Sequence, residues 1–200
     1  MIDTFKTIVS PSAEILLKEK NSKFFGYAFP VTTEDEIKSH LEELRKQHIG
    51  AVHFCYGYQL GIETIQFRAN DDGEPSNSAG MPIYGQIQSF GLSNVLVVVV
   101  RFFGGVKLGV GGLISAYKTS AQMALEESEI IEKTIDVHFQ IFFDYKNMNK
   151  VMRVIKEKNI KIISQLMEDN CKIEIAIRKK NAEIILSIFH TIFEVEIKRL

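Results

Sequence analysis

The chain has no tryptophan, only two cysteines and four prolines, and no long hydrophobic run. Cys55 and Cys171 stand far apart without partners at metal-binding spacing, which favours a reducing compartment over a disulfide scaffold. The longest apolar run, VLVVVV, is far shorter than the roughly 20 residues that a helix needs to cross a bilayer. Because the first residues also lack a basic leader followed by an apolar stretch, we expect a cytoplasmic protein without membrane contact.

Neither sign of charge is in excess, since 24 lysine and arginine residues stand against 25 acidic ones and the net charge is -1. This balance, with 46% hydrophobic residues, is typical of a soluble globular protein and excludes a strongly basic nucleic-acid binder. The charge is uneven along the chain: residues 1–131 carry 11 basic against 15 acidic side chains, and residues 132–200 carry 13 against 10. The split favours two domains, 1–131 and 132–200.

The first 131 residues predict a domain of mixed strands and helices. Thr33 followed by Glu36 has the spacing of a capping box, which marks the start of a helix. The unbroken β-branched run near residue 97 indicates a central strand that is covered on both faces. Periodicity and turn signals predict strands at 5–11, 13–31 (a hairpin broken by KNSK), 53–60, 64–70 and 94–103. They predict helices at 32–48 and 112–128, and a short helix from about Met81 or Pro82 to 90.

From about Glu132 the pattern starts again. Strands are expected at 134–143, 160–168, 171–179 and 193–200, and helices at 144–159 and 181–192. This β-α-β-β-α-β order in about seventy residues is the ferredoxin-like arrangement, in which two helices cover one face of a four-stranded antiparallel sheet. The fold class is therefore α+β with two domains, joined by the stretch EESEIIEKT at 126–134.

The stretch RFFGGVKLGVGGLISAYK, residues 101–118, crowds five glycines between a predicted strand and a predicted helix. Backbone N–H groups at a helix start, and the positive end of the helix dipole, favour an anion there. Arg101 and Lys107 would add positive charge. The alternative is that the glycines serve tight turns and close packing. The stretch fits neither a Walker A loop nor a dinucleotide fingerprint, and the glycines concerned are Gly104, Gly105, Gly109, Gly111 and Gly112.

A second unusual stretch, RANDDGEPSNSAG, places Asp71, Asp72 and Glu74 within four positions. Such carboxylates can bind Mg²⁺ or transfer protons. The same residues are also good turn formers. A third alternative is an ion pair between one of these carboxylates and Arg68 or Arg101, which lie on the predicted strands that lead to the two unusual stretches.

Two further patterns carry weaker signals. His48, His53 and Cys55 lack a fourth ligand, so we expect no zinc site, and we expect no other metal or cofactor. On the predicted helix of the second domain, Lys146, Lys150 and Arg153 share one face. That basic stripe fits phosphate contacts or a merely solvated helix surface.

Three blocks of the sequence, NSKFFGYAFPV, DDGEPSNSAGMPI and VLVVVVRFFGGVKLGVGGLISAY, closely resemble the signature blocks of the IMPACT/YigZ family. The resemblance implies a first domain similar to the second domain of a small-subunit ribosomal protein and a ferredoxin-like second domain. It also implies a role in translational control, to which eukaryotic members are linked, and contact with nucleic acid or the ribosome. The chain departs from the family's usual Gly-Thr at Asn77 and Ser78, and from its usual basic residues at Met81 and Ser115.

Taken with this resemblance, the sequence favours a translation-associated regulator that contacts RNA or the ribosome through the glycine-rich loop. It is more in keeping with a binding protein than with an enzyme. The first alternative is a Mg²⁺-dependent enzyme that uses Asp71, Asp72 and Glu74. The second is a protein-interaction module without nucleic-acid contact. The residues expected to bind an anion or nucleic acid are Arg68, Arg101, Gly104, Gly105, Lys107, Gly109, Gly111, Gly112, Lys118, Lys146, Lys150 and Arg153.

Overall fold

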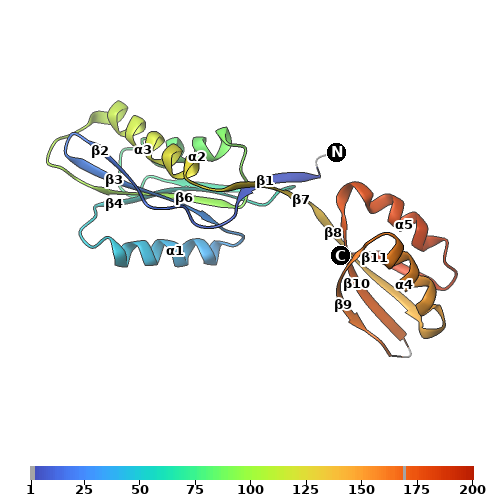
Figure 1. Ribbon diagram of the computed structural model, residues 1–200. Coiled ribbons are helices and arrows are strands. Elements are labelled where there is room, and N and C mark those ends of the chain that lie inside the picture. Colours follow the sequence, from blue (N-terminus) through green and yellow to red (C-terminus); the bar gives the residue numbers. More distant parts are fainter. Residues whose placement is uncertain (1–2, 169) are drawn as a thin grey trace. The chain divides into compact units, whose positions relative to one another are not determined.

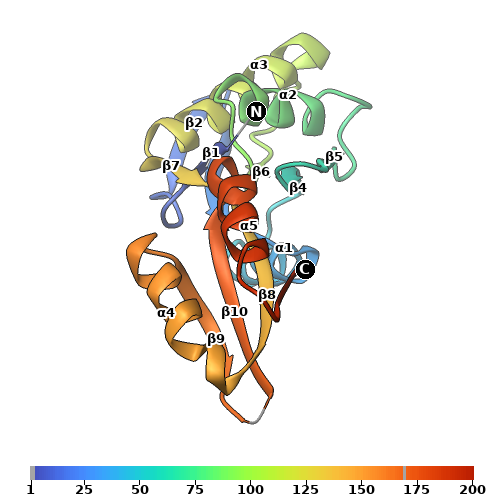
Figure 2. The same cartoon turned by 90° about the vertical axis from the view of Figure 1, so that its right-hand side faces the viewer.

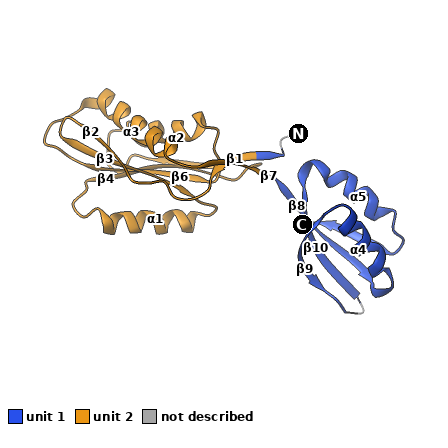
Figure 3. Ribbon diagram, viewed as in Figure 1, with its two compact units in different colours: residues 1–4, 134–200 blue, residues 5–133 orange. Residues whose placement is uncertain are grey.

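The computed structural model describes residues 3–168 and 170–200 and has the expected two-domain mixture of helices and strands (Figure 1, Figure 2). The chain divides into two compact units, one of residues 5–133 and the other of residues 1–4 with 134–200 (Figure 3). The expected boundary at 131/132 lies two residues from this division, and the first residues of the chain group with the second unit. Among the described residues, no helix combines the length and apolar character that crossing a membrane requires.

A five-stranded antiparallel sheet forms the centre of the first unit. Its strand order is β2-β3-β6-β4-β5. The β-branched run makes β6 the middle strand, and Val95 to Val100 are fully buried, which confirms the central strand expected from the sequence. The strands are β2 (Ile15–Glu19), β3 (Ser22–Pro30), β4 (His53–Leu60), β5 (Gln66–Asn70) and β6 (Val95–Phe102).

Helices cover both faces of this sheet (Figure 1). Helix α1 (Glu34–Gln47) packs on one face through Ile37 and Leu44, and its start has the capping box expected at Thr33 and Glu36. Helices α2 (Gly80–Ser89) and α3 (Gly109–Glu126) pack side by side on the other face, around the buried Tyr117. The second face is the one that carries the glycine-rich and acidic stretches.

The stretch expected to join the domains is partly a strand. Strand β7 (Ile130–Thr134) pairs with β1 (Thr4–Ile8) in a two-stranded sheet, and a backbone bond from Val9 N–H to Glu129 C=O extends the pairing. Residues 130–134 lack the alternation that marks a strand, because their only apolar members are Ile130 and Ile131.

The second unit has the strand order β11-β8-β10-β9, with every neighbouring pair antiparallel. Helices α4 and α5 pack on one face of the sheet around the buried Phe139, Ile173 and Phe189. This is the split β-α-β-β-α-β arrangement expected. Its elements are β8 (Asp136–Asp144), the short 3-10 helix η1 (Tyr145–Asn147), α4 (Met148–Glu157), β9 (Lys161–Leu166), β10 (Asn170–Arg178), η2 (Lys179–Asn181), α5 (Ala182–His190) and β11 (Val195–Arg199).

Candidate functional site

The glycine-rich stretch begins helix α3 earlier than expected. The helix starts at Gly109 and not at 112, so three of the five glycines lie in its first turn. Its N-cap residue, Leu108, makes no side-chain cap, and the described first turn contains no acidic residue. The backbone N–H groups of that turn are therefore available to an external acceptor, at the positive end of an 18-residue helix.

Packing explains some of the glycines and not others. A Cβ at Gly104 would lie 2.0 Å from the backbone carbon of Asn21, so close approach of two segments requires glycine there. Gly105 and Gly109 have φ values of +84° and +73°, which glycine adopts without strain. At Gly111, by contrast, a Cβ would meet no described atom within 4 Å, and φ is not positive. Turn chemistry alone does not account for that glycine.

The glycine-rich and acidic stretches line one cleft of about 400 Å³ in the first unit. Glu74 and Pro75 come from the acidic stretch, and Lys107, Leu108 and Gly109 come from the glycine-rich one. The two stretches are about thirty residues apart in the chain. The sheet brings them together because β5, which leads into the acidic stretch, pairs with β4, and β4 pairs with β6, which leads into the glycine-rich stretch. The remaining lining residues that bear on its chemistry are His53, Arg101 and Phe103.

Two of the lining residues form a buried ion pair. Arg101 Nη1 lies 2.6 Å from Glu74 Oε1, and the side chains are only 6% and 4% exposed. The hydroxyl of the fully buried Tyr117 donates to the same carboxylate oxygen at 2.7 Å, and burial raises the pKa of that hydroxyl far above its usual value. The ion pair that the sequence left open between an arginine and the acidic stretch is therefore present, at Arg101.

Arg101 keeps one donor unused. Its Nε–H has no hydrogen-bond partner among the described residues, although the residue is 95% buried. Nη2 lies 3.5 Å from Ser22 Oγ, and the guanidinium carbon is 5.5 Å from the ring centres of both Phe24 and Phe103. A buried N–H without an acceptor is costly. This one belongs to a residue that lines the cleft.

His53 is a cleft residue that sequence reasoning missed. Its Nδ1 lies 2.8 Å from the carbonyl oxygen of Asp72, which can only accept, so Nδ1 carries the proton. Its Nε2 lies 3.7 Å from Glu74 Oε1. The register of the sheet places His53 directly opposite Arg101, a relationship that appears only once β4 and β6 are paired.

Cys55 and His48, which the sequence analysis considered with His53 as zinc ligands, do not line the cleft. Cys55 is fully buried and donates through Sγ to the carbonyl oxygen of Asp71, and burial raises the pKa of its thiol far above the usual value. His48 contacts the Tyr27 hydroxyl on the opposite face of the sheet, in the core that α1 covers. Among the described residues, no group of three or more His, Cys, Asp or Glu side chains could hold a metal ion.

The two aspartates of the acidic stretch have separate structural partners. Asp71 Oδ1 accepts from the backbone N–H groups of Ala79 and Gly80 at the start of α2, and Oδ2 accepts from Asn77 N–H. Asp72 Oδ2 accepts from the N–H of Phe54 at 2.7 Å, and Oδ1 lies 3.3 Å from an Arg45 nitrogen. Three neighbouring carboxylates thus serve three different purposes and do not present a common set of oxygen ligands.

The departures from the family pattern lie away from the cleft lining. Asn77 has a φ of +59°, which asparagine tolerates better than most residues and which explains why it can replace glycine. The Ser78 hydroxyl donates to the Pro75 carbonyl oxygen at 2.6 Å, a bond that threonine could also make. Met81 and Ser115 are exposed and are not among the residues that line the cleft.

The remaining predicted cations do not join this site. Arg68 is exposed on the edge strand β5, and Lys118 is exposed on α3, but neither lines the cleft. In the second unit, Lys146 lies 2.5 Å from Glu194, Lys150 donates to Asn147 Oδ1 at 3.1 Å, and Arg153 lies 3.8 Å from Glu157. The predicted basic stripe is therefore engaged with neighbours in its own unit.

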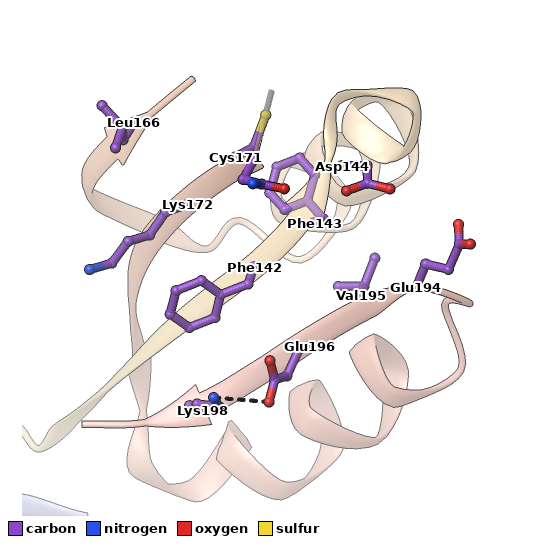
Figure 4. A pocket seen from close by; sticks show the side chains of 11 residues that line it. Phe142, Phe143, Asp144, Leu166, Cys171, Lys172, Glu194, Val195, Glu196 and Lys198 are labelled. Carbon is purple, nitrogen blue, oxygen red and sulfur yellow. Dashed lines mark ion pairs between the residues drawn. The ribbon is translucent and has the colours of Figure 1, made fainter. Parts of the chain in front are cut away.

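The second unit has a larger and shallower hollow, of about 690 Å³, on its sheet (Figure 4). The ring of Phe142 lies there between Lys172 and Lys198, whose ammonium groups are 5.8 and 5.4 Å from the ring centre. Three carboxylates line the same hollow, and one of them, Glu196, pairs with Lys198 at 3.0 Å (Figure 4). The mixed charge makes this surface less suited to an anion than the first-unit cleft.

The sequence matches the Impact N-terminal domain over residues 20–125. It is 31% identical over 180 residues to the IMPACT family member YvyE of Bacillus subtilis, covering 90% of this chain and 82% of that protein. It is 41% identical over 109 residues to an IMPACT family member of Thermus thermophilus, covering 54% of this chain and 58% of that one. The fold matches the crystal structure of a hypothetical protein with a TM-score of 0.76 at 22% identity, covering 100% and 98% of the two chains.

Proposed function

This chain belongs to the IMPACT family, and we propose that it is a translation-associated regulator that binds RNA, free or in the ribosome, through the cleft of its first unit. The translational role is what the family resemblance implies, and the cleft supplies the chemistry for phosphate. A cytoplasmic location is part of the proposal. It agrees with Cys55 and Cys171, which are both buried and unpaired in the described part of the chain.

The observation that carries the proposal is the unused Nε–H of Arg101, a residue that lines the same cleft as the uncapped start of α3. The donor is buried, without a partner among the described residues, and belongs to a side chain that lines the cleft. The first turn of α3 lines the same cleft through Gly109 and Val110. A phosphate oxygen would satisfy the arginine donor and the helix N–H groups together.

The charge of the cleft also favours an anion. Two positively charged side chains, Arg101 and Lys107, and one carboxylate, Glu74, line it. Lys107 is exposed and has no ion-pair partner among the described residues. Glu74 is occupied by two donors, Arg101 and Tyr117. Its role is to hold the guanidinium in place, and Lys107 supplies the surplus positive charge that attracts phosphate.

The test is a salt titration of RNA binding. A fluorescent structured RNA is titrated with wild-type protein, with Lys107→Glu, and with Lys46→Glu as a matched control. Lys46 is an exposed lysine on α1, which covers the opposite face of the sheet. We expect the slope of log affinity against log salt to become shallower by about one in Lys107→Glu and to stay unchanged in the control.

Flat, weak binding by wild-type protein, or equal slopes in the two variants, would refute the proposal. The titration is repeated with and without Mg²⁺, because the enzyme alternative requires a metal at the acidic stretch. The separate engagements of Asp71 and Asp72 give that alternative no support, and we expect the binding to need no divalent ion.

A further inference from the structure

We propose that the RNA held by this cleft is unpaired, and that one of its bases stacks on the ring of Phe103. This inference rests on the proposed function and names the class of RNA. The ring stands where two hollows meet: Phe103 lines the cleft described above and also a second hollow of about 270 Å³, whose other lining residues include Asn21 and Lys23.

The protein core does not use this ring. Phe103 is 48% exposed and belongs to none of the three hydrophobic clusters of the described chain. Its neighbour Phe102, by contrast, packs on the cluster under α1. An exposed aromatic side chain at the edge of a cation-lined cleft is the arrangement on which bases stack in single-strand binding proteins.

The segment that carries the ring is held in place. Gly104 packs against the backbone of Asn21, and its N–H donates to Ser22 Oγ at 3.2 Å. The guanidinium of Arg101 lies 5.5 Å from the centre of the Phe103 ring. Arg101 before Phe103 and Gly104 after it thus hold the ring in position before a ligand binds. A ring that is already ordered lowers the entropic cost of binding.

Each of the two hollows offers a cation for a phosphate. Lys107 and Arg101 line the first, and Lys23 lines the second. Lys23 and Lys107 are exposed and have no ion-pair partner among the described residues. Within the described lining of the two hollows, Glu74 is the one carboxylate, and Arg101 already neutralises it. The phosphates on either side of a base stacked on Phe103 would therefore lie near a cation, Lys107 in one hollow and Lys23 in the other.

This surface differs from the hollow of the second unit, where the aromatic side chain, Phe142, is half-buried. Phe142 in the second unit also lies between lysines, but three carboxylates line that hollow, which opposes a phosphate backbone (Figure 4). The combination of an exposed ring and a surplus of cations is found in the described chain at Phe103. A base that stacks there must have an open face, so a base inside a duplex is excluded.

The experiment compares two labelled probes of equal length, a ten-nucleotide oligouridine and a blunt-ended RNA duplex. The proteins are wild type, Phe103→Leu, Phe103→Trp, Lys107→Glu and Phe193→Leu. The last is a matched control, because Phe193 is 80% exposed and lies in the second unit. Since the chain has no tryptophan, emission from the Phe103→Trp variant reports on that position alone.

We expect Phe103→Leu to weaken oligouridine binding by roughly 5- to 100-fold and to leave duplex binding within about twofold. Phe193→Leu changes neither, and oligouridine quenches the emission of Phe103→Trp. If Phe103→Leu binds oligouridine like wild type, or if the Phe103→Trp emission does not respond, the inference is wrong. Weakening by Lys107→Glu would then still uphold the proposed function, whereas wild-type protein that binds neither probe would refute both. If Phe103→Leu has a lower melting temperature than wild type, the fluorescence response of Phe103→Trp is the result that tests the inference.

Discussion

Arg101 and Glu74 form a buried ion pair, with 2.6 Å between Nη1 and Oε1, that joins the glycine-rich stretch to the acidic stretch. Buried pairs add little net stability over apolar groups of the same shape, but breaking one leaves an uncompensated charge. The pair therefore holds the two stretches together. Its loss is expected to lower the stability of the first unit and to alter the cleft that both residues line.

Arg101→Met is expected to lower the free energy of unfolding of the first unit by about 3–5 kcal/mol, because Glu74 then stays buried without its partner. Adding Glu74→Leu should recover part of the loss. Urea unfolding followed by far-ultraviolet circular dichroism measures both. Arg153→Met removes an exposed pair in the second unit and should change the unfolding curve little; a similar loss in that variant would contradict the assignment.

The buried His48 predicts a loss of stability in mild acid. Burial lowers its pKa below the usual 6.5, so the folded protein resists a proton that the unfolded chain accepts. The free energy of unfolding should therefore be fully present above pH 6.5 and fall as the pH drops below it. His48→Gln should flatten this fall when urea unfolding is measured at several pH values between 7.5 and 5. An unchanged slope would assign the pH dependence to other groups.

Two glycines of the same stretch should respond in opposite ways to alanine. Gly104→Ala drives a methyl group into the Asn21 backbone and should destabilise the first unit by about 1–3 kcal/mol or more. Gly111→Ala meets open space inside α3 and should stabilise it by about 0.5–1 kcal/mol. Thermal melts test both.

Asp71 is predicted to act as a cap for α2 and not as a metal ligand. Asp71→Ala removes the acceptor of three backbone N–H groups and should cost about 2–4 kcal/mol, whereas Asp71→Asn keeps one acceptor oxygen and should cost about half. Millimolar Mg²⁺ should leave the melting temperature of wild type and of both variants unchanged. A Mg²⁺-dependent rise that Asp71→Asn abolishes would revive the enzyme alternative.

Local signals predicted much of the fold. The capping box at Thr33 and Glu36 marked the start of α1, because a cap is made by side chains three positions apart. The β-branched run marked β6 as a central strand for an equally local reason, since a strand buried on both faces cannot alternate. The order of elements in the second unit followed from the same kind of pattern.

The candidate site was predictable only in part. Arg101 and Lys107 drew attention as cations near glycines, but the burial of Arg101 follows from its place between Phe24 on β3 and His53 on β4, and strand pairing is not local. For the same reason His53 was missed. The early start of α3 was missed because glycines disfavour a helix, so three of them in a row of four obscured its first turn.

The chain passes from one unit to the other twice, after residue 4 and after residue 133, and this decides how it can be divided into separately expressed domains. Because Asp3 pairs with Arg178 at 2.7 Å, the segment before β1 belongs with the second unit, and residues 5–133 are nested inside it. The first unit is an insertion whose two ends, β1 and β7, are paired strands. A cut at the single boundary near residue 133 therefore produces an incomplete second unit, whereas excising the insert and rejoining residue 4 to residue 134 would leave it whole.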